Sequence, residues 1–154
     1  MAEFFQVDAI ESVSLNTPIT FNDAIPCNKG YVLHENGTGN FILRGVVNNS
    51  CGCFARYQVT FNGNISIPTG GAVTPIAVAI TLNGEQRQGS RAIFTPAAVD
   101  VYGNVTSTAI ITVPRGCCFN VSVEYVDATT DDPATVPTPT INVQNGNLTV
   151  ARIA

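Results

Sequence analysis

The chain has 154 residues, of which 45% are hydrophobic and only 12% charged, and its formal net charge is −4 at pH 7. This length fits a single domain, and the scarcity of charges, against about a quarter in an average soluble domain, favours a protein that shares its surface with other subunits. Lys29 is the single lysine and the six arginines are scattered, which argues against nucleic-acid binding. No apolar run reaches about 18 residues, which argues against a transmembrane helix.

The first residues, MAEFFQVDAIESV, are acidic and lack the basic start and the long apolar core of a secretion signal. We therefore expect the chain to be made in a cytoplasm and to leave it, if at all, by lysis or by a specialised route. This segment shows only a weak helical pattern.

Short β-rich segments separated by turn signals follow one another from residue 14 onwards. The predicted strands are Ser14–Asn22, Tyr31–Leu33, Phe41–Val47, Phe54–Ile67, Ile76–Leu82, Arg91–Thr95, Val105–Val113, Phe119–Val126, Ile141–Val143 and Leu148–Ile153. Stretches rich in Gly, Asn or Pro separate them, among them the acidic loop Thr129–Pro139. Turn signals at a spacing of roughly 8–12 residues, without an amphipathic helix, predict an all-β antiparallel sandwich or jelly roll.

The clearest alternation lies in Phe54–Ile67, which predicts a half-buried strand. Its two faces carry Phe54, Arg56 and Gln58 on one side and Ala55, Tyr57, Val59 and Phe61 on the other.

Pro75–Glu85 is the most apolar stretch, and the Asn83-Gly84 pair near its end is a strong turn signal, as is Asn145-Gly146 further on. An apolar strand without polar alternate positions needs cover on both faces. One cover could come from another subunit, which makes this strand a candidate for a subunit interface. The candidate residues are Ile76, Val78 and Ile80.

The order of several motifs resembles a known family. The motifs are TPITFND, HENGTGNFILRG, FARYQVTFNG, IAVAITLNGE, STAIITVPRGCCFNVSVEY and a terminal LTVARIA. In this order they resemble the jelly roll of the tumour necrosis factor and complement globular-head superfamily, over roughly Ser14–Ala154. Members of this kind include bacteriophage capsid-decoration or fibre modules and the heads of bacterial collagen-like spore-surface proteins. At Asn48–Cys53 the chain has Cys-Gly-Cys in place of a Gly-aromatic turn.

The resemblance implies a compact homotrimer packed through an apolar sheet around a threefold axis. The side chains that it suggests for this axis are Tyr57, Val59 and Phe61, with Val123 and Tyr125 beside them. The alternative is that these side chains fill the core of the monomer.

Five cysteines occur as Cys27, Cys51-Gly-Cys53 and Cys117-Cys118. Four predicted strands separate the second group from the third, so both groups are expected at the same end of a sandwich. The strand order of the family would place them side by side, and we predict that Cys51 or Cys53 pairs with Cys117 or Cys118. Free buried thiols and a four-thiolate zinc site are the alternatives. Cys27 is expected to be free or to link neighbouring subunits.

Residue types that carry catalysis are few. His34 is the single histidine and lies in a turn, without a nucleophile motif elsewhere, and Asp131-Asp132 lie in a proline-rich loop. We therefore predict no enzyme, with no catalytic residue, cofactor or metal site.

Together these observations predict a non-enzymatic structural protein, a trimeric component of a bacteriophage virion that serves as capsid decoration, head fibre or tail module. Residues 1–13 would form an arm and residues 14–154 the jelly-roll domain, with Ala2–Ser14 docking onto a capsid or another virion protein. The expected location is the virion, and no nucleic-acid or membrane partner is predicted. Two alternatives stay open: a module that binds carbohydrate or a host surface, and a spore- or cell-surface appendage subunit.

Overall fold

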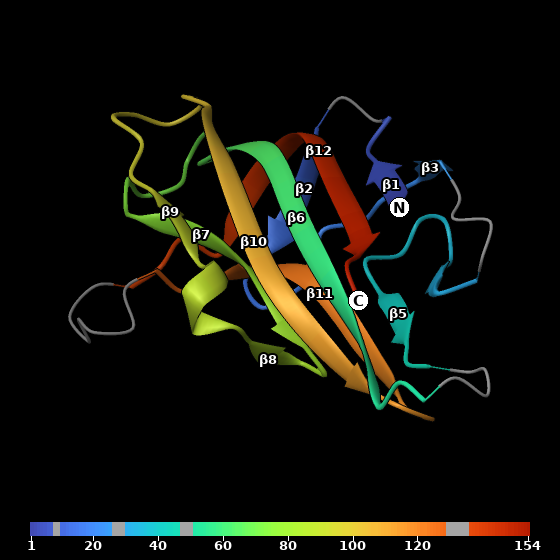
Figure 1. Cartoon of the computed structure of the whole chain (residues 1–154). Helices are drawn as coiled ribbons and strands as arrows, with labels where there is room; N and C mark the ends of the chain where they lie inside the picture. The colour runs from blue at the N-terminus through green and yellow to red at the C-terminus, as the bar shows by residue number, and fades with distance from the viewer. Residues whose placement is uncertain (8–9, 26–29, 47–50, 129–135) are drawn as a thin grey trace.

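Two antiparallel sheets pack face to face in the computed structural model, which describes residues 1–7, 10–25, 30–46, 51–128 and 136–154 (Figure 1). Sheet A has the order β10 (Gly103–Pro114), β6 (Phe54–Ser66), β12 (Thr140–Arg152), β1 (Ala2–Phe5) and β3 (Asp23–Ile25), with β2 (Glu11–Ser14) also paired to β12. Sheet B has the order β4 (Val32–His34), β5 (Phe41–Arg44), β11 (Cys118–Val126), β7 (Ile76–Leu82) and β8 (Glu85–Gln86), with β9 (Ala92–Phe94) paired to β7. A single 3-10 turn, η1 (Gln88–Ser90), is the one helical element among the described residues. The predicted all-β antiparallel sandwich is confirmed.

Strand β6 lies between β10 and β12 and alternates between the core and the outside. Tyr57, Val59 and Phe61 are fully buried, whereas Arg56 and Gln58 on the opposite face are exposed. The predicted alternation in this segment is therefore confirmed. Because odd-numbered side chains point between the sheets, β6 contributes the middle of the core.

The apolar strand β7 is covered on both faces by its own chain. Ile76, Val78 and Ile80 point into the main core and are fully buried. On the opposite face Ala77 and Ala79 are equally buried and cluster with Val126 and the half-buried Ala128. The expectation that this strand needs cover from another subunit is therefore wrong.

The side chains suggested for a trimer axis all lie in the core of the single chain. They are Tyr57, Val59, Phe61, Ile76, Val78, Ile80, Val123 and Tyr125, and none exposes any surface. A side chain with no exposed area cannot contact a second subunit, so these interface candidates are wrong. The alternative, that they fill the core of the monomer, is confirmed.

The first residues belong to the domain and do not form a separate arm. Strand β1 pairs with β12 and β3, strand β2 pairs with β12, and Ala2, Phe4 and Val13 are buried. The Glu11 carboxylate accepts hydrogen bonds from the Thr20 N–H at 3.1 Å and from the Thr20 hydroxyl at 2.8 Å. The predicted boundary before residue 14 is thus wrong. These strands form by pairing with β12 near the end of the chain, and such long-range pairing produces no recognisable pattern in the sequence of the first residues themselves.

Two predicted local features also differ from the structure. Residues 15–22 do not form a strand but cross from sheet A to sheet B, where the N–H groups of Asn16 and Ile19 bind the carbonyls of Tyr125 and Val123, each at 2.8 Å. Pro18 in this crossing lacks the N–H that a ladder would need.

The Asn145-Gly146 pair is a β-bulge and not a turn. Both halves of β12 pair with the same strand, β6, and the register shifts between Gln144 and Asn147. Asn145 has a φ of 55°, and the Gln6 amide oxygen accepts a hydrogen bond from the Gly146 N–H at 3.0 Å. In contrast, the predicted Asn83-Gly84 turn is confirmed, because it joins the paired strands β7 and β8.

Replacing Phe4 by alanine tests whether the first strand supports the core. Phe4 is 4% exposed, and its ring lies edge-on against Phe41 at 4.7 Å between centroids. We expect Phe4→Ala to lower the free energy of unfolding by about 3 kcal/mol in urea denaturation. Val7→Ala is the matched control, since Val7 is 64% exposed, and it should change stability by less than about 0.5 kcal/mol. Equal effects of the two substitutions would contradict the placement of β1.

Candidate functional site

The outward surface of sheet A is built mainly on the three longest strands of the described residues. Its side chains alternate with the buried ones along the three longest strands, which lie side by side in Figure 1. We call it the polar face: Arg56, Gln58, Thr60, Asn62 and Asn64 from β6, Asn104, Thr106, Thr108, Ile110 and Thr112 from β10, and Asn147, Thr149 and Ala151 from β12. Arg56 is the one charged residue in this set, and Glu3 of β1 borders it, where its carboxylate accepts a hydrogen bond from the Asn147 amide at 2.6 Å.

Threonines and asparagines form rows across the polar face. The strand register places Thr108 beside Thr60 and Thr60 beside Thr149, and the next row joins Thr106 and Asn62. The Thr108 and Thr60 hydroxyls are 3.3 Å apart. The side chains in these rows are short, so ordering them costs little side-chain entropy.

The asparagine side chains of the polar face are hydrogen-bonded to one another. The Asn62 and Asn104 side chains exchange hydrogen bonds of 3.2 and 3.1 Å, and Asn62 also donates to the Thr106 hydroxyl at 2.8 Å. Asn104 donates further to the Asn64 side-chain oxygen at 3.1 Å. Since these polar groups already have partners within the sheet, a second surface could cover them at a lower desolvation cost than free amides would impose.

Sequence reasoning did not single out the polar face, because it assigned assembly to the apolar side of β6. The alternation itself was visible, and it placed Arg56 and Gln58 on the other side. The available signal was the recurrence of threonine and asparagine at every second position, as in VTSTAIITV and FNGN.

The described cysteines gather at one end of the sandwich. Strand β6 begins where β10 ends, with Phe54 paired to Pro114, and the Cys53 carbonyl accepts a hydrogen bond from the Arg115 N–H at 3.0 Å. The Gly45 N–H donates to the Cys117 carbonyl at 2.9 Å in the same region. The expected placement of both cysteine groups at one end is therefore confirmed.

Cys51, Cys53, Cys117 and Cys118 are exposed free thiols in this structure. The alternative of buried thiols is wrong for these four. The zinc alternative is also wrong for them, because no three His, Cys, Asp or Glu side chains of the described residues lie close enough together to hold a metal ion. The pairing of the two groups stays a prediction, and Cys27 lies outside the described residues.

The His34 side chain is held in place by ring stacking and by two backbone carbonyls. Its ring is stacked on Phe41 at 4.2 Å between centroids, and the ring nitrogens lie 3.0 Å from the Asn40 carbonyl and 3.1 Å from the Phe21 carbonyl. This arrangement leaves neither nitrogen directed to a substrate. Asp131 and Asp132 lie outside the described residues.

A small cluster of polar side chains is buried on the outward side of sheet B. The hydroxyls of Thr81 and Ser122 are 2.6 Å apart and buried, and the Ser122 hydroxyl donates to Glu124 at 3.3 Å. Burial raises the pKa of the Glu124 carboxyl above its ordinary value of 4.5, and the hydrogen bond from Ser122 opposes this shift. On the inward side, burial and the charge of Asp127 raise the pKa of Tyr125 to about 12, and its hydroxyl donates to the Thr138 carbonyl at 2.6 Å.

Among the described residues, no helix has the length and apolar character needed to cross a membrane.

The chain matches no known protein-family profile and no curated protein sequence. Solved structures with a similar fold include the globular domain of zebrafish complement 1qA, at 15% identity and a TM-score of 0.54, with 95% of this chain and 93% of that chain covered. The Eiger TNF from S. frugiperda is 11% identical with a TM-score of 0.62, and the coverage is 100% of this chain and 92% of that one. The fold is therefore a jelly roll like those of tumour necrosis factor and complement 1q.

A third solved chain, the EclA C-terminal domain described as a sugar-binding protein, is 16% identical over 95% of this chain and 81% of that chain. Its TM-score of 0.40 is too low to relate the two folds.

Oxidation tests the predicted link between the cysteine groups. We expect glutathione disulfide to join Cys51 or Cys53 to Cys117 or Cys118 within one chain, because both groups lie at the same end and are exposed. Peptide mapping under non-reducing conditions identifies the linked peptides. A double variant, Cys51→Ser with Cys53→Ser, should lose this link, and links found only between chains would contradict the pairing.

The pH dependence of stability tests the setting of Glu124. The folded state binds the Glu124 proton more tightly than the unfolded state does, so the stability that this group contributes is complete below pH 4.5 and is lost as the pH rises through the raised pKa. Glu124→Gln removes this loss. The variant should therefore gain more in free energy of unfolding, relative to wild type, near pH 7 than below pH 4.5. Exposed Glu85→Gln is the control, and equal differences at both pH values would contradict the assignment.

Proposed function

We propose that this protein is a non-enzymatic structural module that assembles as a homotrimer through the polar face. The observation that carries the proposal is that this face spans the three longest strands and has a single charged residue on them, Arg56, with the Glu3 carboxylate of β1 at its border. Solvent-facing sheets usually carry charges of both signs, which keep such surfaces monomeric. The jelly-roll fold and the homotrimer implied by the family resemblance support the same proposal.

The size of the polar face suits a small specific interface. It takes about nine residues from each of β6 and β10 and about five from β12, so at about 3.3 Å per residue and about 4.8 Å between strands it spans a plane of roughly 360 Å². The accessible area of its side chains is larger than this plane but lies below the roughly 800 Å² per partner of a typical interface. Internal hydrogen bonds such as Asn62–Asn104 reduce the cost of removing water from it.

The trimer would serve in a bacteriophage virion, as capsid decoration, head fibre or tail module. The support is the low content of charged residues, which suits a subunit that shares its surface, and the resemblance to jelly rolls of phage decoration and fibre proteins. Mass spectrometry of density-purified virions tests this role. The chain should appear in the particles at a fixed ratio to the major capsid protein, whereas recovery in a spore- or cell-surface fraction alone would contradict it.

A single charge in the middle of the polar face tests the assembly. Thr60 lies between Thr108 and Thr149, so in a trimer Thr60→Glu would bury a carboxylate without a partner. In sedimentation equilibrium, wild type should have a mass about three times 16.2 kDa and Thr60→Glu the mass of one chain.

The control places the same charge elsewhere. Thr95 is exposed in the loop after β9, outside the polar face, and Thr95→Glu should stay trimeric. Circular dichroism shows whether Thr60→Glu remains folded. A monomeric wild type, or equal masses for the two variants, would contradict the proposal.

A further inference from the structure

Strand β10 is an unusually long open edge. It ends sheet A on one side and has 12 residues, all paired with β6 from Gly103 to Pro114. The strands that end the other sides of the two sheets, β3, β4 and β8, have three, three and two residues. Short edge strands are a common protection against unwanted strand pairing, and β10 lacks it.

Other protections are also missing from β10. Its sequence, GNVTSTAIITVP, contains no charged residue, and its proline is the last residue. The register with β6 continues without a bulge. Natural proteins rarely leave a regular, uncharged edge of this length free, so the edge is suited to pairing with another strand.

Hydrogen-bonding groups on the open side of β10 face outward. The Arg87 guanidinium donates to the Ile110 carbonyl at 3.5 Å, which shows that this carbonyl points away from β6. Because the direction alternates along a strand, the N–H and C=O groups of Thr108 and Thr112 point to the same side. Among the described residues, the Cys117 N–H bonds the Pro114 carbonyl at 3.2 Å, and no other backbone group pairs with this side of β10.

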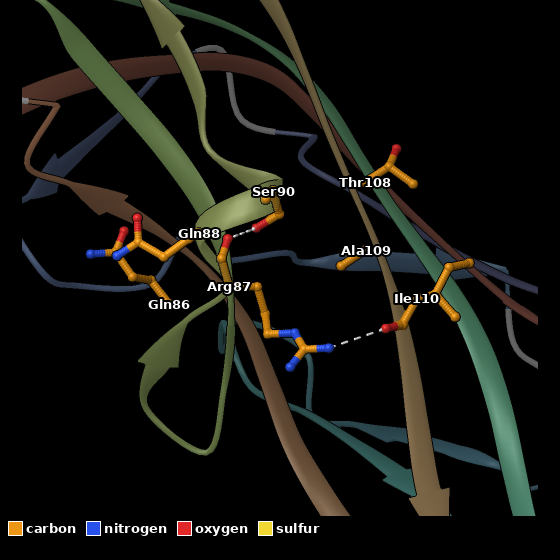
Figure 2. A pocket seen from close by; sticks show the side chains of 8 residues that line it. Gln86, Arg87, Gln88, Ser90, Thr108, Ala109 and Ile110 are labelled. Atoms are coloured by element: carbon orange, nitrogen blue, oxygen red, sulfur yellow. Dashed lines mark hydrogen bonds between the residues drawn. The ribbon is translucent and has the colours of Figure 1, made fainter.

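A cavity of about 490 Å³ lies beside this edge, between β10 and the segment that contains β8 and η1. Figure 2 shows Arg87 reaching towards Ile110, whereas the side chains of Gln86 and Gln88 lie on the far side of that segment from β10. Arg87 is the one charged residue that lines the cavity. Its contact with Ile110 is long and exposed, so an incoming group could replace it at little cost.

The position of Arg87 distinguishes between possible occupants of the edge. A second copy paired antiparallel about Ile110 would bring two guanidinium groups together, and like charges at such positions destabilise strand pairing. A strand that carries a carboxylate would instead neutralise Arg87 with a charge-assisted hydrogen bond. Charge therefore favours an acidic partner segment over a second copy.

We propose that the open edge of β10, from Thr108 to Thr112, binds an extended acidic peptide segment of a partner protein by strand addition. The backbone of the segment pairs with the outward groups of Thr108, Ile110 and Thr112. Arg87 turns from the Ile110 carbonyl to a carboxylate of the segment. This site uses the edge of sheet A and its backbone, so it does not depend on assembly through the polar face.

The probe is a capped heptapeptide in which threonine and valine alternate on both sides of one central glutamate. The control peptide has glutamine in place of this glutamate. Binding is followed by chemical shifts of the β10 amides in NMR titrations. We expect the largest shifts at Thr108, Ile110 and Thr112. The glutamate peptide should bind about threefold more tightly than the glutamine peptide, and Arg87→Gln should abolish this difference.

Thr108→Pro tests strand addition directly. Proline is tolerated on an edge where the N–H faces outward, so β10 should stay paired with β6 while one donor to the peptide is lost. We expect peptide affinity to fall about fivefold or more, whereas Thr108→Val, which keeps the N–H and loses the same hydroxyl, should bind as wild type does. Spectra without peptide show whether both variants keep the fold.

Three results would overturn the proposal. The first is the absence of shifts on β10 at millimolar peptide. The second is equal binding by Thr108→Pro and Thr108→Val, which would show that the peptide contacts Arg87 without joining the sheet. The third is self-association of wild type that Thr108→Pro abolishes but Thr60→Glu leaves unchanged, which would make a second copy the occupant of the edge.

Discussion

The register of β6 between β10 and β12 is the constraint on which the rest of the structure depends. β6 pairs with β10 from Phe54 to Ile65, and with β12 from Tyr57 to Ser66 across one bulge. A slip by one residue would turn Tyr57 and Phe61 towards water and bury Arg56. Each large buried apolar side chain is worth about 1.5–3 kcal/mol, so turning out the four on this strand would cost about as much as the net stability of a domain, about 5–15 kcal/mol. One alternation therefore fixes both the core and the polar face.

Local patterns predicted the long strands well. The alternation of Phe54–Ile67, the apolar run before Asn83 and the segment Phe119–Val126 all correspond to strands, because their side chains report burial on one or both faces. The first strands were missed, since β1 and β2 are short and exist through pairing with β12, more than a hundred residues away. Asn145-Gly146 has the same residues as the true turn at Asn83-Gly84. Only the shared partner strand β6 makes it a bulge.

The candidate site was predicted less well for a physical reason. Alternation shows that β6 has an apolar and a polar side, but it does not show which side meets another subunit. Interfaces are often thought of as apolar, and the apolar side was assigned to the trimer axis. In the structure the second sheet covers that side completely, with Val123 and Tyr125 of β11 among the covering residues. The proposed assembly therefore uses the side with Thr60 and Asn62, whose amides and hydroxyls are already partnered.

The surfaces of the molecule thus separate by chemistry. The polar face has mostly short uncharged side chains, with Arg56 as the exception on its three strands, and we propose that it packs against copies of the same chain. The edge of β10 offers backbone groups beside one guanidinium, and the end of the sandwich where β10 ends exposes the cysteine thiols. Intersubunit distances between spin labels, measured by pulsed electron paramagnetic resonance, test the central claim most directly. The five cysteines of the chain are first replaced, and a single label is then attached in each of two samples. One sample carries it at Arg56→Cys on the polar face, and the other at Ile42→Cys on sheet B, where Ile42 is 41% exposed. Assembly through the polar face predicts a shorter intersubunit distance for residue 56 than for residue 42. The reverse order, or no intersubunit distance at all, would contradict it.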